Sequence, residues 1–295
     1  MTQLTFLDLS GIEFTGSLPS LERFSNLAYL SLSDVNLYGE IPSSFFNLTR
    51  VGTLVLSRNQ LIGQLPSSLL NLQNLESFYL DGNNATVDFY LFLSLKNLNY
   101  LNLRGNNIRL SVIDSHKTET QFKVLWRASC NLKVFPEFLR FQHQLEFLYL
   151  DNNKIEGLIP GWMWNISKET LIELRLSQNL LMGFEQHSLV APWVNLMILD
   201  LSHNMLHGSI PLPPPLTYSF SVSNNKLTGE IPPSICNLIY LQSLDLSFNI
   251  ITGSIPPCLE KLSNSNLVVL NLRNNALQGT IPNVFTNKSQ LEMID

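Results

Sequence analysis

Charged side chains are scarce in this sequence of 295 residues: they make up 14% of it and leave a net charge of −5. Proteins that bind nucleic acid carry a basic face, so this balance argues against DNA or RNA as a partner. Long apolar runs are also missing, since the longest, over 89–95, is far shorter than the roughly 18 residues of a membrane helix. Three cysteines are too few for a disulfide scaffold.

Signals for secretion and for chemistry are missing as well. Met1 is followed by neither a basic stretch nor an apolar core, so the sequence opens without a signal peptide. His203 and His207 fall on a predicted turn and beyond it rather than on a helix, which argues against a metal site. Phosphate-binding loops and nucleophile motifs do not appear. The sequence therefore predicts no enzyme activity, no cofactor and no metal ion.

A repeated pattern of leucine and asparagine, in contrast, runs through the whole chain. Its consensus is Leu-x-x-Leu-x-Leu-x-x-Asn-x-Leu-x-Gly-x-Ile-Pro, and the stretch 241–256 fills every position. Copies begin at Leu4, Leu27, Val51, Leu75, Leu98, Phe122, Leu145, Leu171, Leu196, Thr217, Leu241 and Leu267. The steps of 21 to 26 residues lie within the range of leucine-rich repeats, roughly 20–29. We therefore predict one α/β repeat solenoid over residues 1–295, an arc of about twelve repeats with a parallel sheet on its concave face.

Each position of the repeat has a physical role. The Leu-x-Leu alternation forms a short strand with one buried and one exposed face. Asparagine follows in all complete repeats except those with Ile12, Val35 and Cys130, and we expect its amide to satisfy backbone groups in the turn and in the next coil. Segments such as 67–72 are predicted to close each coil as short helical turns on the convex side. Cys130 is expected to be a buried thiol. Arg127 stands where other repeats have Leu or Val, so it either escapes burial by local distortion or strains its repeat.

Four stretches carry a resemblance to a known family: 128–132, 162–167, 213–232 and 268–275. Together with the Leu-x-Gly-x-Ile-Pro half of the repeat, they make the chain similar to the ectodomain of plant leucine-rich repeat receptor-like proteins. The resemblance implies a receptor at the plasma membrane, with a secreted ectodomain, one membrane helix and a short tail without a kinase. It also implies a pathogen-derived protein or peptide ligand, a role in defence signalling, and co-receptor kinases as partners.

Parts of that family pattern are absent from these residues. The first repeat starts at about Leu4 without a cysteine-bearing cap, and a thirteenth begins at Leu291 and stops at Asp295. We therefore expect a partial ectodomain, uncapped at both ends, whose link to the membrane is a helix outside these residues. Two alternatives share the repeat class: a secreted enzyme inhibitor of the polygalacturonase-inhibitor type, and the ectodomain of a leucine-rich repeat receptor kinase.

Strand positions between the leucines point to the concave face, which is the usual binding surface of a solenoid. Aromatic side chains gather at these positions in four consecutive repeats, with charged neighbours. The candidate ligand-binding residues are Tyr79, Tyr100, Arg104, Trp126, Phe147, Tyr149, Asp151 and Arg175. Aromatic rings bury large areas at little entropic cost, as binding patches require. The alternative is that aromatic residues suit strands and merely cover the sheet.

Glycosylation sequons and a cysteine pair complete the candidate sites. The sequons begin at Asn47, Asn84, Asn165 and Asn287, and are acceptor sites if the chain is secreted. All but Asn84 share one place in the repeat, on the predicted convex side. Cys236 and Cys258 lie just beyond the prolines of adjacent repeats, where stacking brings their backbones within roughly 7 Å. That separation is near the limit for a disulfide, so bonded and free thiols both stay open.

Overall fold

The computed structural model describes residues 3–21, 23–109, 118, 120–185, 190–263, 266–281, 291 and 293–294. The sequence predicts one repeat domain, and the contacts between residues group the chain into two compact units. Unit 1 comprises Met1–Leu132 and Pro136–Leu145, and unit 2 comprises Lys133–Phe135 and Glu146–Asp295. Both are stacks of the predicted coils, and each is described by itself.

The strands of unit 1 form one parallel sheet whose order follows the sequence. They are β1 (Phe6–Asp8), β2 (Tyr29–Ser31), β4 (Thr53–Val55), β6 (Ser77–Tyr79), β8 (Tyr100–Asn102) and β10 (Val124–Trp126). Every strand is three residues long, and its central residue, such as Leu54 or Phe78, is buried in all but the first strand. The outer two residues face away from the core because side chains alternate along a strand.

A second sheet and a row of helical turns complete the coils of unit 1. The second sheet is also parallel and consists of β3 (Tyr38–Glu40), β5 (Gln60–Gln64), β7 (Asn84–Asp88) and β9 (Asn107–Arg109). The helical turns are η1 (Ser43–Asn47), η2 (Ser67–Asn71), α1 (Tyr90–Leu93) and η3 (Glu137–Phe141). A proline in extended conformation precedes η1, η2 and η3, so the predicted Ile-Pro return leads directly into the turn.

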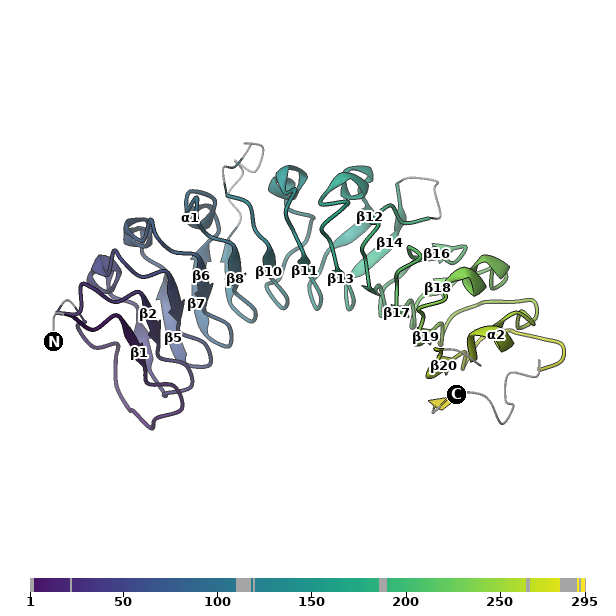
Figure 1. The fold of residues 1–295 in the computed structure, drawn as a ribbon, viewed down its shortest axis with the longest axis horizontal. Coiled ribbons are helices and arrows are strands. Elements are labelled where there is room, and N and C mark those ends of the chain that lie inside the picture. The colour runs from purple at the N-terminus through teal and green to yellow at the C-terminus, as the bar shows by residue number, and fades with distance from the viewer. Residues whose placement is uncertain are drawn as a thin grey trace. The chain divides into compact units, whose positions relative to one another are not determined.

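Unit 2 repeats the same plan, with strands along one side of each coil and helical turns along the other (Figure 1). Its main strands are β11 (Phe147–Tyr149), β13 (Glu173–Arg175), β15 (Ile198–Asp200), β17 (Ser219–Ser221), β19 (Ser243–Asp245), β20 (Val269–Asn271) and β21 (Met293–Ile294). Two short parallel pairs take the place of the second sheet: β12 (Glu156–Ile159) with β14 (Leu180–Phe184), and β16 (His207–Gly208) with β18 (Lys226–Leu227). The helical side contains η4 (Gly161–Asn165), η5 (Pro233–Asn237) and α2 (Leu259–Ser263).

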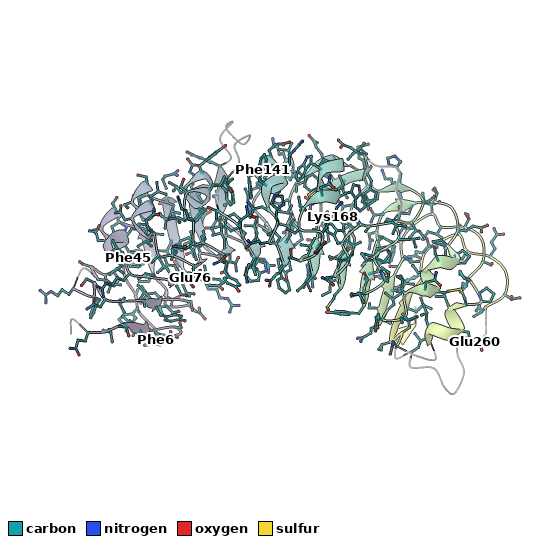
Figure 2. All side chains as sticks on the ribbon, turned by 45° about the horizontal axis from the view of Figure 1, so that its top comes forward. Phe6, Phe45, Glu76, Phe141, Lys168 and Glu260 are labelled. Carbon is teal, nitrogen blue, oxygen red and sulfur yellow. A yellow bond between two sulfur atoms is a disulfide. The ribbon has the colours of Figure 1, made fainter. Side chains whose placement is uncertain are left out.

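Side chains fill the space between the strands and the helical turns in both units (Figure 2). In unit 1, Phe45 of η1 is buried from the helical side, whereas Phe6 on β1 projects outward and is stacked on Tyr29 with ring centroids 4.3 Å apart. The buried leucines of successive coils form the core, as the repeat predicts.

The repeated asparagine joins each coil to the one before it. Asn249 is representative: its Oδ1 accepts a hydrogen bond from the Leu227 N–H at 3.0 Å, and its Nδ2 donates to the carbonyls of Val222 and Leu246 at 2.9 and 3.1 Å. Equivalent bonds occur at Asn59, Asn83, Asn106, Asn179, Asn204, Asn225 and Asn275. Val222 and Leu227 belong to the preceding coil, so the expected bond to the next coil was wrong in direction. The side chain reaches backward because the backbone groups that it satisfies outside its own turn, such as the Leu227 N–H, belong to the preceding coil.

The sixth repeat departs from this pattern at two buried positions. Cys130 stands in the asparagine position as a buried free thiol, with its Sγ 3.5 Å from the Leu103 carbonyl oxygen. Arg127 does not escape burial: its side chain is completely covered, and its guanidinium carbon lies 3.9 Å from the centre of the Phe89 ring and 5.7 Å from that of Phe138. Aromatic faces attract a cation, so the two rings offset part of the cost of burying this charge.

We expect Asn83→Ala to lower the free energy of unfolding of the chain by about 2–4 kcal/mol, because it leaves buried backbone groups of two coils without their partner. The matched control is Asn71→Ala, at an exposed asparagine at the end of η2 whose side chain makes no hydrogen bond in the described residues. Urea unfolding followed by circular dichroism measures both variants. Equal loss of stability in the two would contradict the structural role of the amide.

Candidate functional site

The outward positions of the short strands form a continuous face on each unit. Parallel pairing places equivalent residues side by side, so that Val55, Tyr79, Asn102 and Trp126 form one row across unit 1. These side chains are partly exposed, while the leucines and phenylalanines between them face the core. Each repeat therefore has two or three outward positions whose side chains can be of any type, because they do not pack in the core.

On unit 1 the structure brings two of the predicted aromatic residues together. Tyr79 and Trp126 flank Asn102 in the same row, and their rings lean toward each other with centroids 6.4 Å apart. Tyr100 lies in the neighbouring row, opposite Ser77 and Val124. Burial raises the pKa of Tyr79 above its ordinary value, although a hydrogen bond with Ser77 opposes the shift. Tyr79 thus stays protonated and presents a hydroxyl group beside an indole.

Arg104 of unit 1 is exposed in the turn after β8. Its backbone N–H donates to Oδ1 of Asn102, which fixes the start of that turn. The charged side chain therefore stands at the margin of the aromatic group rather than inside it.

On unit 2 the predicted residues gather around an ion pair that sequence reasoning missed. Phe147 and Tyr149 lie on β11 with parallel rings 6.5 Å apart, and the guanidinium carbon of Arg175 lies 5.9 Å from the centre of the Tyr149 ring. The Nε of Arg175 donates to Oε1 of Glu173. Glu173 is buried, since Phe147 and Ile198 flank it in the same row. The Glu-x-Arg spacing was the available signal, because residues two apart in a strand share a face.

The charge state of Arg175 follows from these neighbours. Burial by itself lowers the pKa of Arg175, but the hydrogen bond to Glu173 and the negative charges of Glu173 and Asp200 outweigh it and raise the pKa. The guanidinium is accordingly a fixed cation, held along one edge by Glu173. Asp151, the second residue after β11, is half-buried. The eight predicted binding residues are thus divided between the two units, four on each.

Three aspartates at the ends of strands close the turns that follow those strands. Asp200 accepts hydrogen bonds from the Ser202 N–H and Oγ at 3.0 and 2.7 Å, and Asp245 accepts the same pair from Ser247. Both aspartates are half-buried. Asp8 is exposed, and its bonds from Ser10 lower its pKa. These residues belong to separate repeats, so they form no acid–base pair.

Two of the predicted glycosylation sites occupy the same place on the helical side. Asn47 is the last residue of η1 and Asn165 the last residue of η4, and both are exposed. Asn84 is exposed at the start of β7, where its Oδ1 accepts a hydrogen bond from Asn107. Asn287 lies outside the described residues.

The cysteines of adjacent coils on the helical side of unit 2 are bonded. Cys236 on η5 and Cys258, just before α2, form a disulfide with their Cα atoms 5.9 Å apart. The backbones therefore come closer than the stacking estimate from sequence.

Neither a metal centre nor a membrane helix is found in the described part of the chain. No three His, Cys, Asp or Glu side chains in it lie close enough together to hold an ion, and His203 lies beside Asn224 in a turn. None of its helices has the length and apolar character needed to cross a bilayer.

The sequence matches a family model described as Leucine Rich Repeat at residues 26–48, 144–166, 195–216, 218–238, 240–262 and 266–288. Among curated proteins, it is 40% identical to Receptor-like protein 6 of Arabidopsis thaliana over 74% of this chain, and 36% identical to Receptor-like protein 39 of the same plant over 80%. The chain spans only 22% and 30% of these two proteins.

Solved structures of plant receptor ectodomains share the fold. The ectodomain of the Arabidopsis receptor kinase HAESA, in complex with an extended IDA peptide hormone, matches 98% of this chain with a TM-score of 0.86 and 30% identity. The PEPR1–AtPEP1 complex matches 98% of the chain with a TM-score of 0.77 and 26% identity. The chain covers 49% and 44% of those two proteins.

When the chain is secreted from plant cells behind an added signal peptide, we expect N-glycans on Asn47, Asn84, Asn165 and Asn287. Asn71 ends η2 as Asn47 ends η1, but Gln73 breaks the sequon, so Asn71 should stay bare and serves as the internal control. Mass spectrometry of tryptic glycopeptides measures each site. Four unmodified sequons would contradict an extracellular location.

Proposed function

The chain belongs to the leucine-rich repeat family and is related to plant receptor-like proteins, and from this we propose that it is part of the extracellular region of such a receptor, at the plasma membrane. Its role there is to recognise a protein or peptide ligand on the strand face. The observation that carries the proposal is the concentration of aromatic rings on that face, in the pair Tyr79–Trp126 and in the pair Phe147–Tyr149 beside Arg175.

The chemistry of the two groups fits a polypeptide ligand. Partly exposed aromatic rings offer apolar area with few rotamers to freeze, which favours them as anchors of a protein interface. Arg175 adds a cation whose position Glu173 fixes in advance, so little entropy is lost when an acidic group binds. In solved structures of the same fold, the HAESA ectodomain is bound to the IDA peptide hormone, and PEPR1 is in complex with AtPEP1.

From its relationship to plant receptor-like proteins, we also propose that the chain acts in a signalling assembly. Its part there is that of a binding module without catalytic activity of its own. We propose a pathogen-derived protein or peptide as the ligand, with defence as the output. We also propose co-receptor kinases as partners of the whole receptor, as SERK1 is the co-receptor of HAESA in a solved complex. Attachment to the membrane would be through a segment outside these residues.

The ectodomain of a receptor kinase is the second candidate, because HAESA superimposes closely on the chain. Identity to the receptor-like proteins reaches 40%, against 30% to HAESA, and so favours the first candidate. Sequencing the transcript past Asp295 separates the two: a membrane helix with a short tail supports the receptor-like protein, and a kinase domain supports the alternative.

We expect Tyr79→Ala, Trp126→Ala and Tyr149→Ala each to weaken ligand binding by roughly 1–3 kcal/mol, since each removes an anchor ring. The substitutions are made in a receptor-like protein that contains these repeats and has an identified ligand, and affinity is measured by calorimetry. Tyr38→Ala is the matched control, because Tyr38 is an exposed tyrosine on β3 of the second sheet.

The control variant should bind as the parent does, and all four variants should keep the parent melting temperature within a few degrees. Unchanged affinity in the three strand-face variants, with folding intact, would show that the rings merely cover the sheet.

A further inference from the structure

A second regular set of side-chain amides lines one edge of the strand face. It is formed by the residue immediately before the first position of most repeats, which is asparagine or glutamine except at Arg50, Thr170, Leu216 and Tyr240. We call this edge the leading flank. Asn74, Asn97, Asn195 and Asn266 each donate a hydrogen bond from Nδ2 to a carbonyl oxygen of the preceding repeat, at 2.9, 2.8, 2.6 and 2.7 Å. The acceptors are Thr49, Gln73, Glu169 and Ile239, which lie at equivalent places two residues before the first leucine or valine of their repeats.

Two consecutive repeats of unit 2 break this row with apolar residues. Leu216 stands before Thr217 and Tyr240 stands before Leu241, where the repeats on both sides have Asn195 and Asn266. Neither replacement is explained by packing, because both side chains are exposed, Tyr240 by 51%. The chain has thus given up a hydrogen bond between coils at two adjacent positions and gained exposed apolar surface there. Local rules are broken in this way mostly where function requires it.

The exposed residues enclose a groove. It has a volume of about 310 Å³ and is lined by Met197, Leu216, Tyr218, Tyr240, Gln242 and Asn266. Val194 and Ile239, exposed by 54% and 58%, extend the apolar surface along the same flank. The equivalent positions of unit 1 carry mainly small or polar residues, for example Gly52, Glu76 and Lys123 in the place of Met197 and Tyr218. An apolar patch with a polar border is typical of an interaction site.

We propose that this groove on the leading flank is a second binding surface, distinct from the strand face, for an uncharged extended segment of a protein partner. The segment places an aliphatic or aromatic side chain between Leu216, Tyr218 and Tyr240. None of the lining residues is an acid or a base, so a charged side chain would lose its hydration without gaining a partner. An apolar side chain has no such cost.

In this proposal, the side chain of Gln242 binds the polypeptide backbone on either side of the apolar residue. Its side chain is exposed at the groove and makes no hydrogen bond in the described part of the chain. A primary amide presents one acceptor and two donors, which match the C=O and N–H of a peptide group. The surface is also open to a partner, because no sequon occurs between residues 190 and 281.

The test uses substitutions that restore the regular row. In the double variant Leu216→Asn and Tyr240→Asn, both new amides should donate to the preceding repeat as Asn195 does, so the melting temperature should equal or exceed that of the parent. Neither change creates a sequon. The matched control is Met182→Asn, at an exposed apolar residue of β14 in the same unit but outside the groove.

The probes are biotinylated capped pentapeptides of the form Gly-Ser-X-Ser-Gly on a biosensor surface, with X as Leu, Phe, Asp or Lys. We expect the secreted 295-residue chain to bind the Leu and Phe peptides at least tenfold more tightly than the Asp and Lys peptides. The double variant should lose this preference by tenfold or more, the Met182→Asn control should keep it, and Gln242→Ala should weaken all peptides alike. Strand-face variants such as Tyr149→Ala should leave it unchanged.

Two results would overturn the proposal. The first is that the parent chain binds the Leu and Phe peptides no more tightly than the Asp and Lys peptides, or that the folded double variant keeps the same preference as the parent. The other is self-association of the parent chain in light scattering that disappears in the double variant, without peptide binding, since the groove would then accommodate a second copy of this chain.

Discussion

The buried asparagine amide is the interaction on which the rest of the structure depends. A coil of about two dozen residues cannot enclose a core alone, and its turn leaves backbone groups with no partner inside the coil. Each amide supplies an acceptor and two donors at that point and joins two coils at the same time, as Asn249 does between Leu227 and Leu246. It also sustains the turn itself: the residue before it has a positive φ even where it is bulky, as Phe248 with 54°.

Because leucine and asparagine supply the framework, the outward strand positions are free to vary without affecting it. Unit 1 uses them for the Tyr79–Trp126 pair, and unit 2 uses them for a ring pair beside a fixed Arg175–Glu173 ion pair. Later strands of unit 2 have serine there, for example Ser219 and Ser221 on β17. The proposed recognition therefore rests on a few side chains on a surface whose geometry is set by the buried framework, as is general for solenoids.

Periodicity made most of the fold predictable from the sequence, because each repeat position has one role in every coil. The alternation within a strand likewise predicted which aromatic residues face outward, and Tyr79 and Trp126 do so. Departures from the repeat were not predictable. The rings that cover Arg127 come from its own coil (Phe138) and from the coil two before it (Phe89), and Glu173 is buried by Phe147 and Ile198 on the strands beside it. Such contacts depend on the lateral register of side chains, which a one-dimensional pattern does not contain.

The disulfide between Cys236 and Cys258 has a mechanical consequence. Coils touch only their neighbours, so a pulling force on one end would peel the stack one coil after another. The bond closes a segment of 22 residues, nearly one complete coil. That segment cannot unravel under tension, which withholds about 75 Å of contour length from extension. The disulfide thus makes repeats ten and eleven resist stretching, while the coils without a covalent link separate first.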